Sequence, residues 1–333
     1  MRRSVGPGAI LTLGIFALAG CGNGGVLNGN TPVTPPVVPK VSAEYAIPSA
    51  VNAQDITAAS DGFLYATESQ SNKIAKMSVA GAFTEFNIPT ANAQPAGIVR
   101  GPDGALWFTE PNANQIGTMT TAGIFTEYPL GPGERPLFIT VGSDGNLWFT
   151  EPGINSVGHM DRNGKLFTPA IIPTAGSQPS GIVGGPDGAL WFTEVSGNKI
   201  GRVTTSGIVT EYALPTANAR PMGIVLGQDG ALWFAESGSG KLGRITTAGV
   251  ITENALLAGS APNSLTLGSD GNFYVSDGGN NSIDQVIVNG KYTVTAFAIP
   301  TAGAQPGNGV LGPDLKIYFV ELAGKKIGQF TYF

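Results

Sequence analysis

Apolar residues gather in short runs that are separated by turn residues and return at a regular interval along the chain. The segment Gly101–Glu110, GPDGALWFTE, shows this unit clearly. Within it, Leu106 and Phe108 would lie on one side of a strand and Trp107 on the other, so that both sides are apolar. A strand of this kind is typical of a sheet that packs between two neighbouring sheets.

The same unit occurs seven times. Besides Gly101–Glu110, copies stand at Ser60–Glu68, Gly142–Glu151, Gly185–Glu194, Gly227–Glu236, Ser269–Asp277 and Pro313–Glu321. Their aspartates lie about 41 to 44 residues apart along the chain. A repeat of about 40–50 residues with strand-like content is typical of a β-propeller blade.

One repeat predicts four strands. Beside the apolar run described above, strands are expected over Pro95–Val99, Asn114–Met119 and Phe125–Tyr128. A turn is expected at Pro102-Asp103-Gly104, because proline fixes φ, aspartate caps the turn and glycine accepts a positive φ. No segment shows sustained helical periodicity. The sequence therefore predicts an all-β protein, a seven-bladed β-propeller of four-stranded blades.

The two ends of the repeat region predict how the ring closes. The last repeat stops at Phe330–Phe333, inside its third strand, and has no fourth. At the other end, Ala43–Pro48 (AEYAIP) matches Thr210–Pro215 (TEYALP), a fourth strand from the middle of the chain. We expect the N-terminal strand to complete the last blade, which would remove two exposed sheet edges at once.

The residues before the repeats read as a targeting segment. Arg2 and Arg3 precede an apolar run, Ala9–Ala19, which is too short for a permanent membrane span. Leu18-Ala19-Gly20-Cys21 resembles the bacterial lipobox, in which the cysteine is lipidated. We therefore expect a lipoprotein signal peptide over residues 1–21, a Gly/Pro-rich linker over residues 22–42 and the propeller over residues 43–333.

These features predict an exported protein that is anchored by its lipid to the cell envelope, either facing the periplasm or at the outer membrane. Cys21 is the only cysteine, so no disulfide forms within the chain. Without Arg2 and Arg3, 16 basic residues stand against 23 acidic ones, which argues against nucleic acid as a partner. A monomer is expected, with an unidentified small molecule, peptide or envelope protein as its ligand.

Each second strand ends on an acid, and the seven would form a ring around one mouth of the central channel. They are Glu68, Glu110, Glu151, Glu194, Glu236, Asp277 and Glu321. The functional interpretation is a site for a cation, with some pKa values raised by like-charged neighbours. The structural interpretation is that each acid accepts hydrogen bonds within its own or the next blade, because a site rarely needs seven equivalents.

Two places interrupt an otherwise uniform channel mouth. Gly131–Pro136 departs from the repeat and brings Glu134 and Arg135, and Arg220 stands alone in another loop. We therefore name as candidate ligand-loop residues Glu134, Arg135 and Arg220. His159 is the only histidine and falls in a third strand, which excludes histidine-based triads and two-histidine metal sites.

The unit GPDGALWFTE followed by NKIGRVTTSGIVTEYALPT resembles the streptogramin B lyase (virginiamycin B lyase) family over Ala43–Phe333. The resemblance implies a seven-bladed propeller, and for active members a Mg²⁺-dependent carbon–oxygen lyase that opens the ester of a cyclic depsipeptide by elimination. That chemistry needs a base for the proton α to a carbonyl and a metal to stabilise the enolate. In the family the base is a histidine, in Pro-His-Gly or Pro-His-Ala at the start of a first strand.

No histidine stands at the matching positions of this chain, which are Ala96, Leu137 or Phe138, Ser180, Met222, Asn263 and Gly307. One hypothesis is therefore a non-catalytic binding module on the family's scaffold. The alternative is an enzyme, either a Mg²⁺-dependent lyase acting on streptogramin B-type depsipeptides or a lactonase-like hydrolase. In that alternative the channel-mouth carboxylates carry the chemistry, with a raised pKa making one of them a base.

Overall fold

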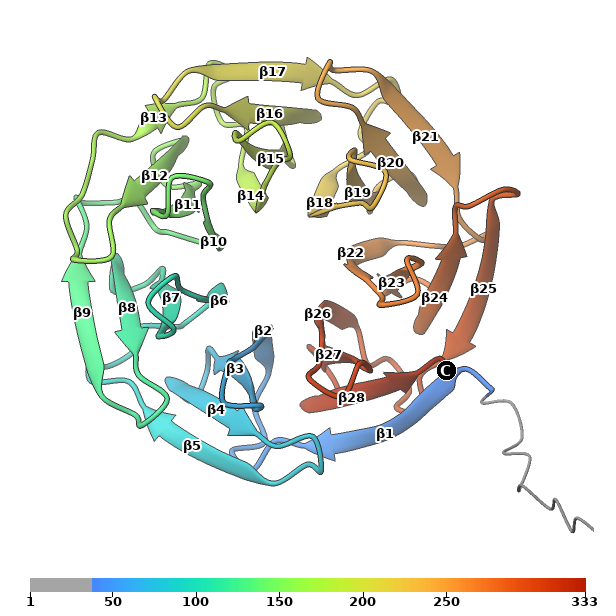
Figure 1. The fold of residues 1–333 in the computed structure, drawn as a ribbon, viewed down its shortest axis with the longest axis horizontal. Coiled ribbons are helices and arrows are strands. Elements are labelled where there is room, and N and C mark those ends of the chain that lie inside the picture. The colour runs from blue at the N-terminus through green and yellow to red at the C-terminus, as the bar shows by residue number, and fades with distance from the viewer. Residues whose placement is uncertain (1–37) are drawn as a thin grey trace, which may run out of the picture. The chain divides into compact units, whose positions relative to one another are not determined.

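A computed structural model describes residues 38–333, so the predicted signal peptide, Cys21 and most of the linker lie outside the described residues. The described chain forms seven four-stranded antiparallel sheets, or blades, arranged around a central axis (Figure 1). This confirms the predicted all-β, seven-bladed propeller. Over the described range, no helix is long and apolar enough to span a membrane.

Six blades follow chain order from the inner to the outer strand. Blade 1 contains β2 (Ala53–Ala58), β3 (Leu64–Glu68), β4 (Lys73–Met77) and β5 (Phe83–Asn87). Blade 2 contains β6 (Ile98–Arg100), β7 (Leu106–Glu110), β8 (Gln115–Met119) and β9 (Phe125–Pro129). Blade 3 contains β10 (Ile139–Val141), β11 (Leu147–Glu151), β12 (Ser156–Met160) and the two-residue β13 (Ala170–Ile171).

The second half of the ring repeats this order. Blade 4 contains β14 (Pro179–Gly184), β15 (Leu190–Glu194), β16 (Lys199–Val203) and β17 (Val209–Ala213). Blade 5 contains β18 (Pro221–Leu226), β19 (Leu232–Glu236), β20 (Lys241–Ile245) and β21 (Ile251–Ala255). Blade 6 contains β22 (Pro262–Leu267), β23 (Phe273–Asp277), β24 (Ser282–Ile287) and β25 (Thr293–Ala298).

Blade 7 joins the beginning and the end of the propeller. It contains β26 (Pro306–Leu311), β27 (Ile317–Glu321) and β28 (Lys326–Thr331), and its outer strand is β1 (Lys40–Ala46). Glu44 of β1 accepts hydrogen bonds from the Thr301 backbone N–H at 3.0 Å and from Lys326 Nζ at 3.3 Å. The expectation that the N-terminal strand completes the last blade is confirmed.

The aromatic residue of each second strand fixes the turn before it. Trp107 Nε1 donates to Asp103 at 3.2 Å, and the backbone N–H of Ala105 donates to the same carboxylate. Gly104 takes a φ of +81° there, as the turn requires. The same aromatic-to-aspartate hydrogen bond recurs in every blade, through Tyr65, Trp148, Trp191, Trp233, Tyr274 and Tyr318.

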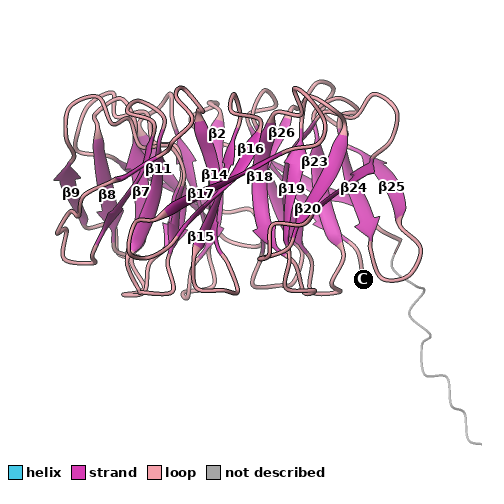
Figure 2. Cartoon of the chain, turned by 90° about the horizontal axis from the view of Figure 1, so that it is seen from above, coloured by secondary structure: helices cyan, strands magenta, loops and turns pink. Residues whose placement is uncertain are grey.

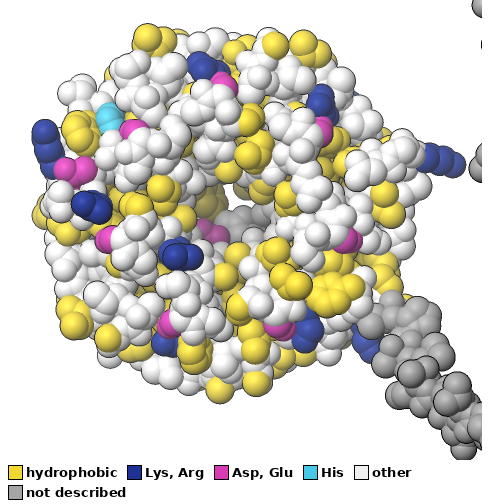
Figure 3. All heavy atoms as spheres, in the orientation of Figure 1, with side chains coloured by type: hydrophobic (Ala, Val, Ile, Leu, Met, Phe, Trp, Pro, Cys, Tyr) yellow, Lys and Arg dark blue, Asp and Glu magenta, His cyan; other side chains and the backbone are white. Residues whose placement is uncertain are grey.

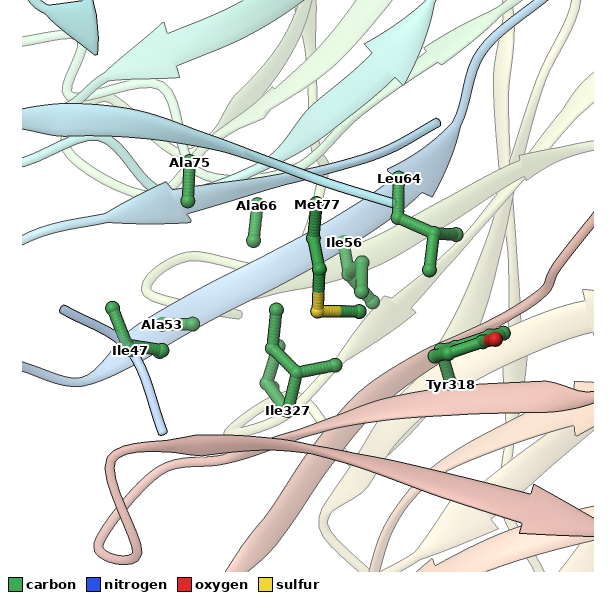
Figure 4. Close-up of a cluster of buried hydrophobic side chains, with 10 residues drawn as sticks. Ile47, Ala53, Ile56, Leu64, Ala66, Ala75, Met77, Tyr318 and Ile327 are labelled. Atoms are coloured by element: carbon green, nitrogen blue, oxygen red, sulfur yellow. The ribbon is translucent and has the colours of Figure 1, made fainter. Parts of the chain in front are cut away.

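The apolar core lies between adjacent blades. In one cluster, Ile56, Leu64 and Met77 of blade 1 pack against Tyr318 and Ile327 of blade 7 (Figure 4). These side chains are almost fully buried, as the apolar character of both faces of the second strand predicts. The core therefore holds each blade to its neighbours, including across the joint between the two ends.

The loops divide between two faces of the ring (Figure 2). Loops from a fourth strand to the next first strand contact loops that follow the second strand. For example, the Asn112 N–H donates to the Ala93 carbonyl at 3.2 Å, and the Gly238 N–H to the Ala219 carbonyl at 2.9 Å. We call the face that carries these two loop sets the upper face. It is the face on which the sequence places the channel mouth.

Candidate functional site: the central cavity

A cavity of about 610 Å³ occupies the hub of the propeller. Its walls are residues of the inner strands β2, β10, β14, β18, β22 and β26, which surround the axis in Figure 1. Upper-face loop residues such as Gly278 and Gln305 also line it. A space-filling view shows a hollow at this point (Figure 3). The cavity is large enough for a drug-sized ligand.

Most of the polar residues that line the cavity come from two successive positions at the start of the inner strands. The first position holds Gln54, Ala96, Leu137, Ser180, Met222, Asn263 and Gly307. Backbone hydrogen bonds settle the alternative left open in blade 3, because the Leu137 N–H bonds the Thr150 carbonyl just as the Ala96 N–H bonds that of Thr109. The positions at which the family resemblance implies a histidine are therefore at or beside the cavity.

The second position holds Asp55, Gly97, Phe138, Gly181, Gly223, Ser264 and Asn308. Backbone hydrogen bonds establish this equivalence too, since the N–H groups of Asp55, Gly97 and Phe138 all bond the threonine hydroxyl of their own second strand. Six of the seven residues line the cavity. One arc of the hub is therefore polar, and other parts are formed by glycine or by an aromatic ring.

Asp55 is the residue that sequence reasoning missed. Its Oδ2 accepts the Ile98 N–H at 2.9 Å and its Oδ1 accepts the Ile56 N–H at 2.9 Å. Burial raises the pKa of Asp55 to about 6, although these hydrogen bonds and the side chain of Asn308 oppose the rise. An alignment of first strands would have revealed it, because Asp55 stands where Gly97 precedes Ile98 in the next repeat.

The predicted carboxylate ring is buried inside the blades. The seven acids are at most 1% exposed, and none of them is among the residues that line the cavity. Glu110 accepts a hydrogen bond from Gln115 at 2.7 Å, and Glu151 from Ser156 at 2.6 Å. Glu68 and Glu236 accept hydrogen bonds from loop serines, and Asp277 accepts them from loop backbone N–H groups. These contacts agree with the structural interpretation in five blades, whereas the buried carboxyls of Glu194 and Glu321 accept no hydrogen bond.

Burial shifts the titration of the six glutamates of the ring. Burial raises the pKa of Glu110, Glu236 and Glu321 to about 7 and that of Glu194 to about 8. Burial also raises the pKa of Glu68, and it raises that of Glu151, with Glu134 adding to the shift. At neutral pH, therefore, a proton is present for a large share of the time on Glu110, Glu151, Glu194, Glu236 and Glu321.

In most blades a glutamate of the fourth strand lies near the buried acid. In blade 4 this is Glu211, which accepts the Thr174 N–H at 3.0 Å and Lys199 Nζ at 3.1 Å. Thr174 belongs to the loop that enters blade 4, so the glutamate fixes that loop. Glu85, Glu127, Glu253 and Glu44 make the same contact in blades 1, 2, 5 and 7.

The residues of the predicted ligand loop lie on the upper face, outside the cavity lining. Glu134 accepts the Gly131 N–H at 2.9 Å, and its own carbonyl accepts the Gly153 N–H. Arg135 and Arg220 are exposed and take φ angles of +53° and +51°. The structure therefore does not bring Arg135 and Arg220 together with Asp55, and their role as ligand contacts stays a prediction.

His159 is far from a catalytic arrangement. Its ring stacks between Trp148, at a centroid distance of 4.0 Å, and Phe167, at 4.8 Å. Burial lowers the pKa of His159, and the charge of Asp144 partly offsets this. The equivalent residues in blades 4 and 5 are Arg202 and Arg244, which form ion pairs with Asp187 and Asp229.

The cavity is also a poor match for the Mg²⁺ that the family resemblance implies. Within residues 38–333, no group of three or more His, Cys, Asp or Glu side chains is placed to hold a metal ion. Mg²⁺ binds oxygen ligands with near-octahedral geometry. Asp55 is the one carboxylate among the described residues that line the cavity, which leaves most of an octahedral ligand set without a charged oxygen donor.

The ring of seven blades around an open hub defines a β-propeller with a ligand-sized central cavity. The model of the virginiamycin B lyase family matches residues 38–256 and 170–332. The chain therefore belongs to the virginiamycin B lyase family. No curated protein sequence matches it.

Solved structures agree with this assignment. A streptogramin B lyase structure has 35% sequence identity and a TM-score of 0.82, covering 87% of this chain and 96% of that one. The virginiamycin B lyase of Staphylococcus aureus has 36% identity and the same TM-score, with 87% and 99% coverage. A catalytically inactive histidine-to-alanine variant of virginiamycin B lyase from that organism, solved with quinupristin, gives 35% identity and a TM-score of 0.82, with the same 87% and 99% coverage.

Proposed function

We propose that this protein is a non-catalytic binding module that holds a small molecule or peptide in the central cavity. The observation that carries the proposal is the place of His159. The only imidazole of the chain is stacked between Trp148 and Phe167 in blade 3, and the cavity is lined without it. A general base has to be within hydrogen-bond reach of the proton that it removes.

The family comparison supports this proposal. A histidine-to-alanine variant of the Staphylococcus aureus enzyme is described as catalytically inactive. This chain carries Gln, Ala, Leu, Ser, Met, Asn and Gly at the seven inner-strand positions that start each blade. This chain thus has the family's scaffold, while every position at which the resemblance implies a histidine holds another residue.

The test separates binding from turnover. Quinupristin is incubated with the purified propeller and Mg²⁺, and the reaction is followed by liquid chromatography and mass spectrometry. We expect full recovery of the intact ring. A panel of peptide-like molecules that includes quinupristin is then screened for binding by ligand-observed NMR. We expect binding that is lost in Met222→Trp, which places a bulky ring in the cavity wall, and retained in Met222→Leu.

Ring-opened product would overturn the non-catalytic assignment. If no member of the panel binds in a way that depends on Met222, the cavity is not a binding site and the proposal fails. Both variants must show the native unfolding temperature within a few degrees, so that a loss of binding reports on the cavity and not on folding.

The second candidate function is ring opening of a streptogramin B-type depsipeptide, or lactone hydrolysis. Family membership and the raised pKa of Asp55 favour it, since a partly protonated carboxyl can exchange protons with a ligand. If turnover is found, Asp55→Asn should abolish it. Loss of turnover in Glu151→Gln or Glu194→Gln instead would assign the chemistry to the predicted carboxylate ring, with Mg²⁺ as its cofactor.

We also propose that the protein is exported as a monomer and anchored to the cell envelope through a lipid on Cys21, which lies outside the described residues. Metabolic labelling with a fatty acid should mark the protein, and Cys21→Ser should abolish both the label and the membrane fractionation. An unlabelled, fully soluble native protein would contradict this.

A further inference from the structure

One negative charge stands in the cavity without a cation. Of the described residues that line the cavity, Asp55 is the only one with an ionisable side chain. The other polar lining residues are amides and hydroxyls, such as Gln54, Asn263, Ser264 and Asn308. In contrast, the acids on the outer strands have cationic partners, such as Lys199 for Glu211 and Lys241 for Glu253.

Asp55 is held in place by the fold. Its two carboxylate oxygens accept backbone N–H groups from β2 and from β6 of the next blade. The inner strand is the edge of its sheet, so the backbone N–H groups that point away from the sheet have no partner strand. Asp55 provides a hydrogen-bond acceptor for one of them, the N–H of Ile98. Each carboxylate oxygen has a second lone pair, so Asp55 can accept a further hydrogen bond from a donor in the cavity.

The rest of the lining gives the ligand an apolar contact surface. Phe138 and Met222 line the same cavity. Phe138 directly precedes β10 in blade 3, and Met222 belongs to β18 in blade 5. Gly181 and Gly223 stand at the position of Asp55 in blades 4 and 5, so that part of the wall carries no side chain. A pocket with one charge, a few hydrogen-bonding groups and apolar walls favours an amphipathic ligand.

Building on the proposed function, we propose that the cavity binds an organic cation, a primary ammonium group on an apolar body, with Asp55 as its counter-ion. A partly buried carboxylate gains more from a cation than an exposed one does, because the surroundings screen the charges less. The ammonium would donate to Asp55 and to neighbouring amide oxygens, and the apolar body would lie against Phe138 or Met222.

A monovalent organic cation fits this wall better than a divalent metal. Ca²⁺ takes six to eight oxygen ligands and Mg²⁺ near-octahedral geometry. The described lining offers one carboxylate, and the residues 38–333 contain no acidic or histidine cluster placed to hold a metal. An ammonium needs only three acceptors, and an amphipathic one also uses the apolar wall.

The experiment compares three probes of similar shape and different charge. Benzylammonium, benzyl alcohol and benzoate are titrated into the propeller at about pH 7.5, where Asp55 and the amine are both ionised. Binding is measured by ligand-observed NMR at low ionic strength. We expect benzylammonium to bind at least about tenfold more tightly than benzyl alcohol, and benzoate to bind most weakly.

Two sets of variants assign the effect to Asp55. Asp55→Asn keeps the shape and one acceptor oxygen, and it should reduce benzylammonium binding to the level of benzyl alcohol without changing benzyl alcohol binding. Met222→Lys places a tethered ammonium in the cavity and should displace benzylammonium even if Asp55→Asn folds poorly. Met222→Leu is its matched control, because it changes the same side chain without adding a charge, and it should keep the preference for benzylammonium over benzyl alcohol.

The outcomes distinguish this inference from the function on which it rests. If all three probes bind equally in a Met222-dependent manner, the cavity is a binding site, but the preference for cations is wrong. The same holds if folded Asp55→Asn retains the native preference for benzylammonium. If no probe binds and no panel molecule binds, the proposed function and this inference fail together.

Discussion

Val275 faces Asp284 across β23 and β24, where five other blades place a phenylalanine opposite a glycine. The two arrangements are mutually exclusive. A Cβ added to Gly201 would stand 2.1 Å from the ring of Phe192, so any side chain on the third strand requires a smaller residue on the second. Blade 6 meets this requirement with valine, and blade 1 with the pair Ala66 and Ala75.

This pairing predicts that Val275→Phe alone is destabilising. The ring would enter space that the buried Asp284 side chain occupies, and overpacking of a core costs about 1–3 kcal/mol. Adding Asp284→Gly recreates the arrangement of the other blades and should recover more than half of the loss. Urea unfolding of the two single variants and the double variant measures this. Additive effects, with no coupling between the sites, would contradict the prediction.

The buried glutamates predict how stability depends on pH. The pKa of Glu110, Glu194, Glu236 and Glu321 lies at about 7 to 8 in the folded protein, against an ordinary value of 4.5. The folded state therefore binds more protons between these values, and the free energy of unfolding falls as the pH rises. The stabilising effect is complete below about pH 4.5 and is lost through about pH 8.

The outer glutamates set the acid side of the same curve. The pKa of Glu44, Glu85, Glu211 and Glu253 is lowered, by hydrogen bonds to the loop and to lysine that outweigh burial. Their contribution is lost as the pH falls below about 4.5, so we expect maximal stability near pH 5. Thermal unfolding between about pH 4 and pH 9 tests this, and Glu194→Gln should flatten the slope by up to about 1 kcal/mol per pH unit. A stability maximum near pH 8 would refute the prediction.

Ring closure by β1 predicts a strong effect of a short deletion. A chain that begins at Ile47 lacks β1, so β28 becomes an exposed edge and the Thr301 N–H loses its partner Glu44. We expect the unfolding temperature to fall by roughly 10 °C or more, with association through the exposed edge. A chain that begins at Val38 is the matched control and should unfold like the full chain. Equal unfolding temperatures would show that β1 does not hold the ring.

His159 gives a direct probe of blade 3. Because it is the only histidine, its NMR signal needs no further assignment. Stacking between Trp148 and Phe167 buries the ring, so its pKa should lie below 6.5, and Asp144→Asn should lower it further by removing a favourable charge. A pKa at or above 6.5 would place the ring in water and contradict the stacked position.

The sequence predicted the architecture well because each blade repeats the same strands and turns with similar residues. The period, the turn chemistry at Asp103 and the match between Ala43–Pro48 and Thr210–Pro215 each depend on local residues that are visible one after another. The blade number and the closing strand followed from them. The TEY pattern of the outer strand contains the glutamate that fixes the incoming loop, but this contact became clear only in three dimensions.

The candidate site was harder to predict, because the sequence does not show which way a side chain points. Glu110 and its equivalents end strands at the upper face, yet their carboxyls turn into the blade toward residues such as Gln115. Asp55 carries no motif, and its importance depends on the register that brings residues from six of the seven distant repeats to the cavity wall. The local sequence pattern therefore identified the propeller fold but not the residues that line its central cavity.

The pairing of β1 with β28 also fixes the order in which the protein can be completed. Every other sheet is assembled from consecutive segments and can form as soon as its own residues have left the ribosome. The outermost strand of blade 7 is made before all the others, and its partner is made last. That early strand cannot pair with β28 until synthesis reaches Lys326–Thr331, so the closing sheet of the ring is completed after the other six can form.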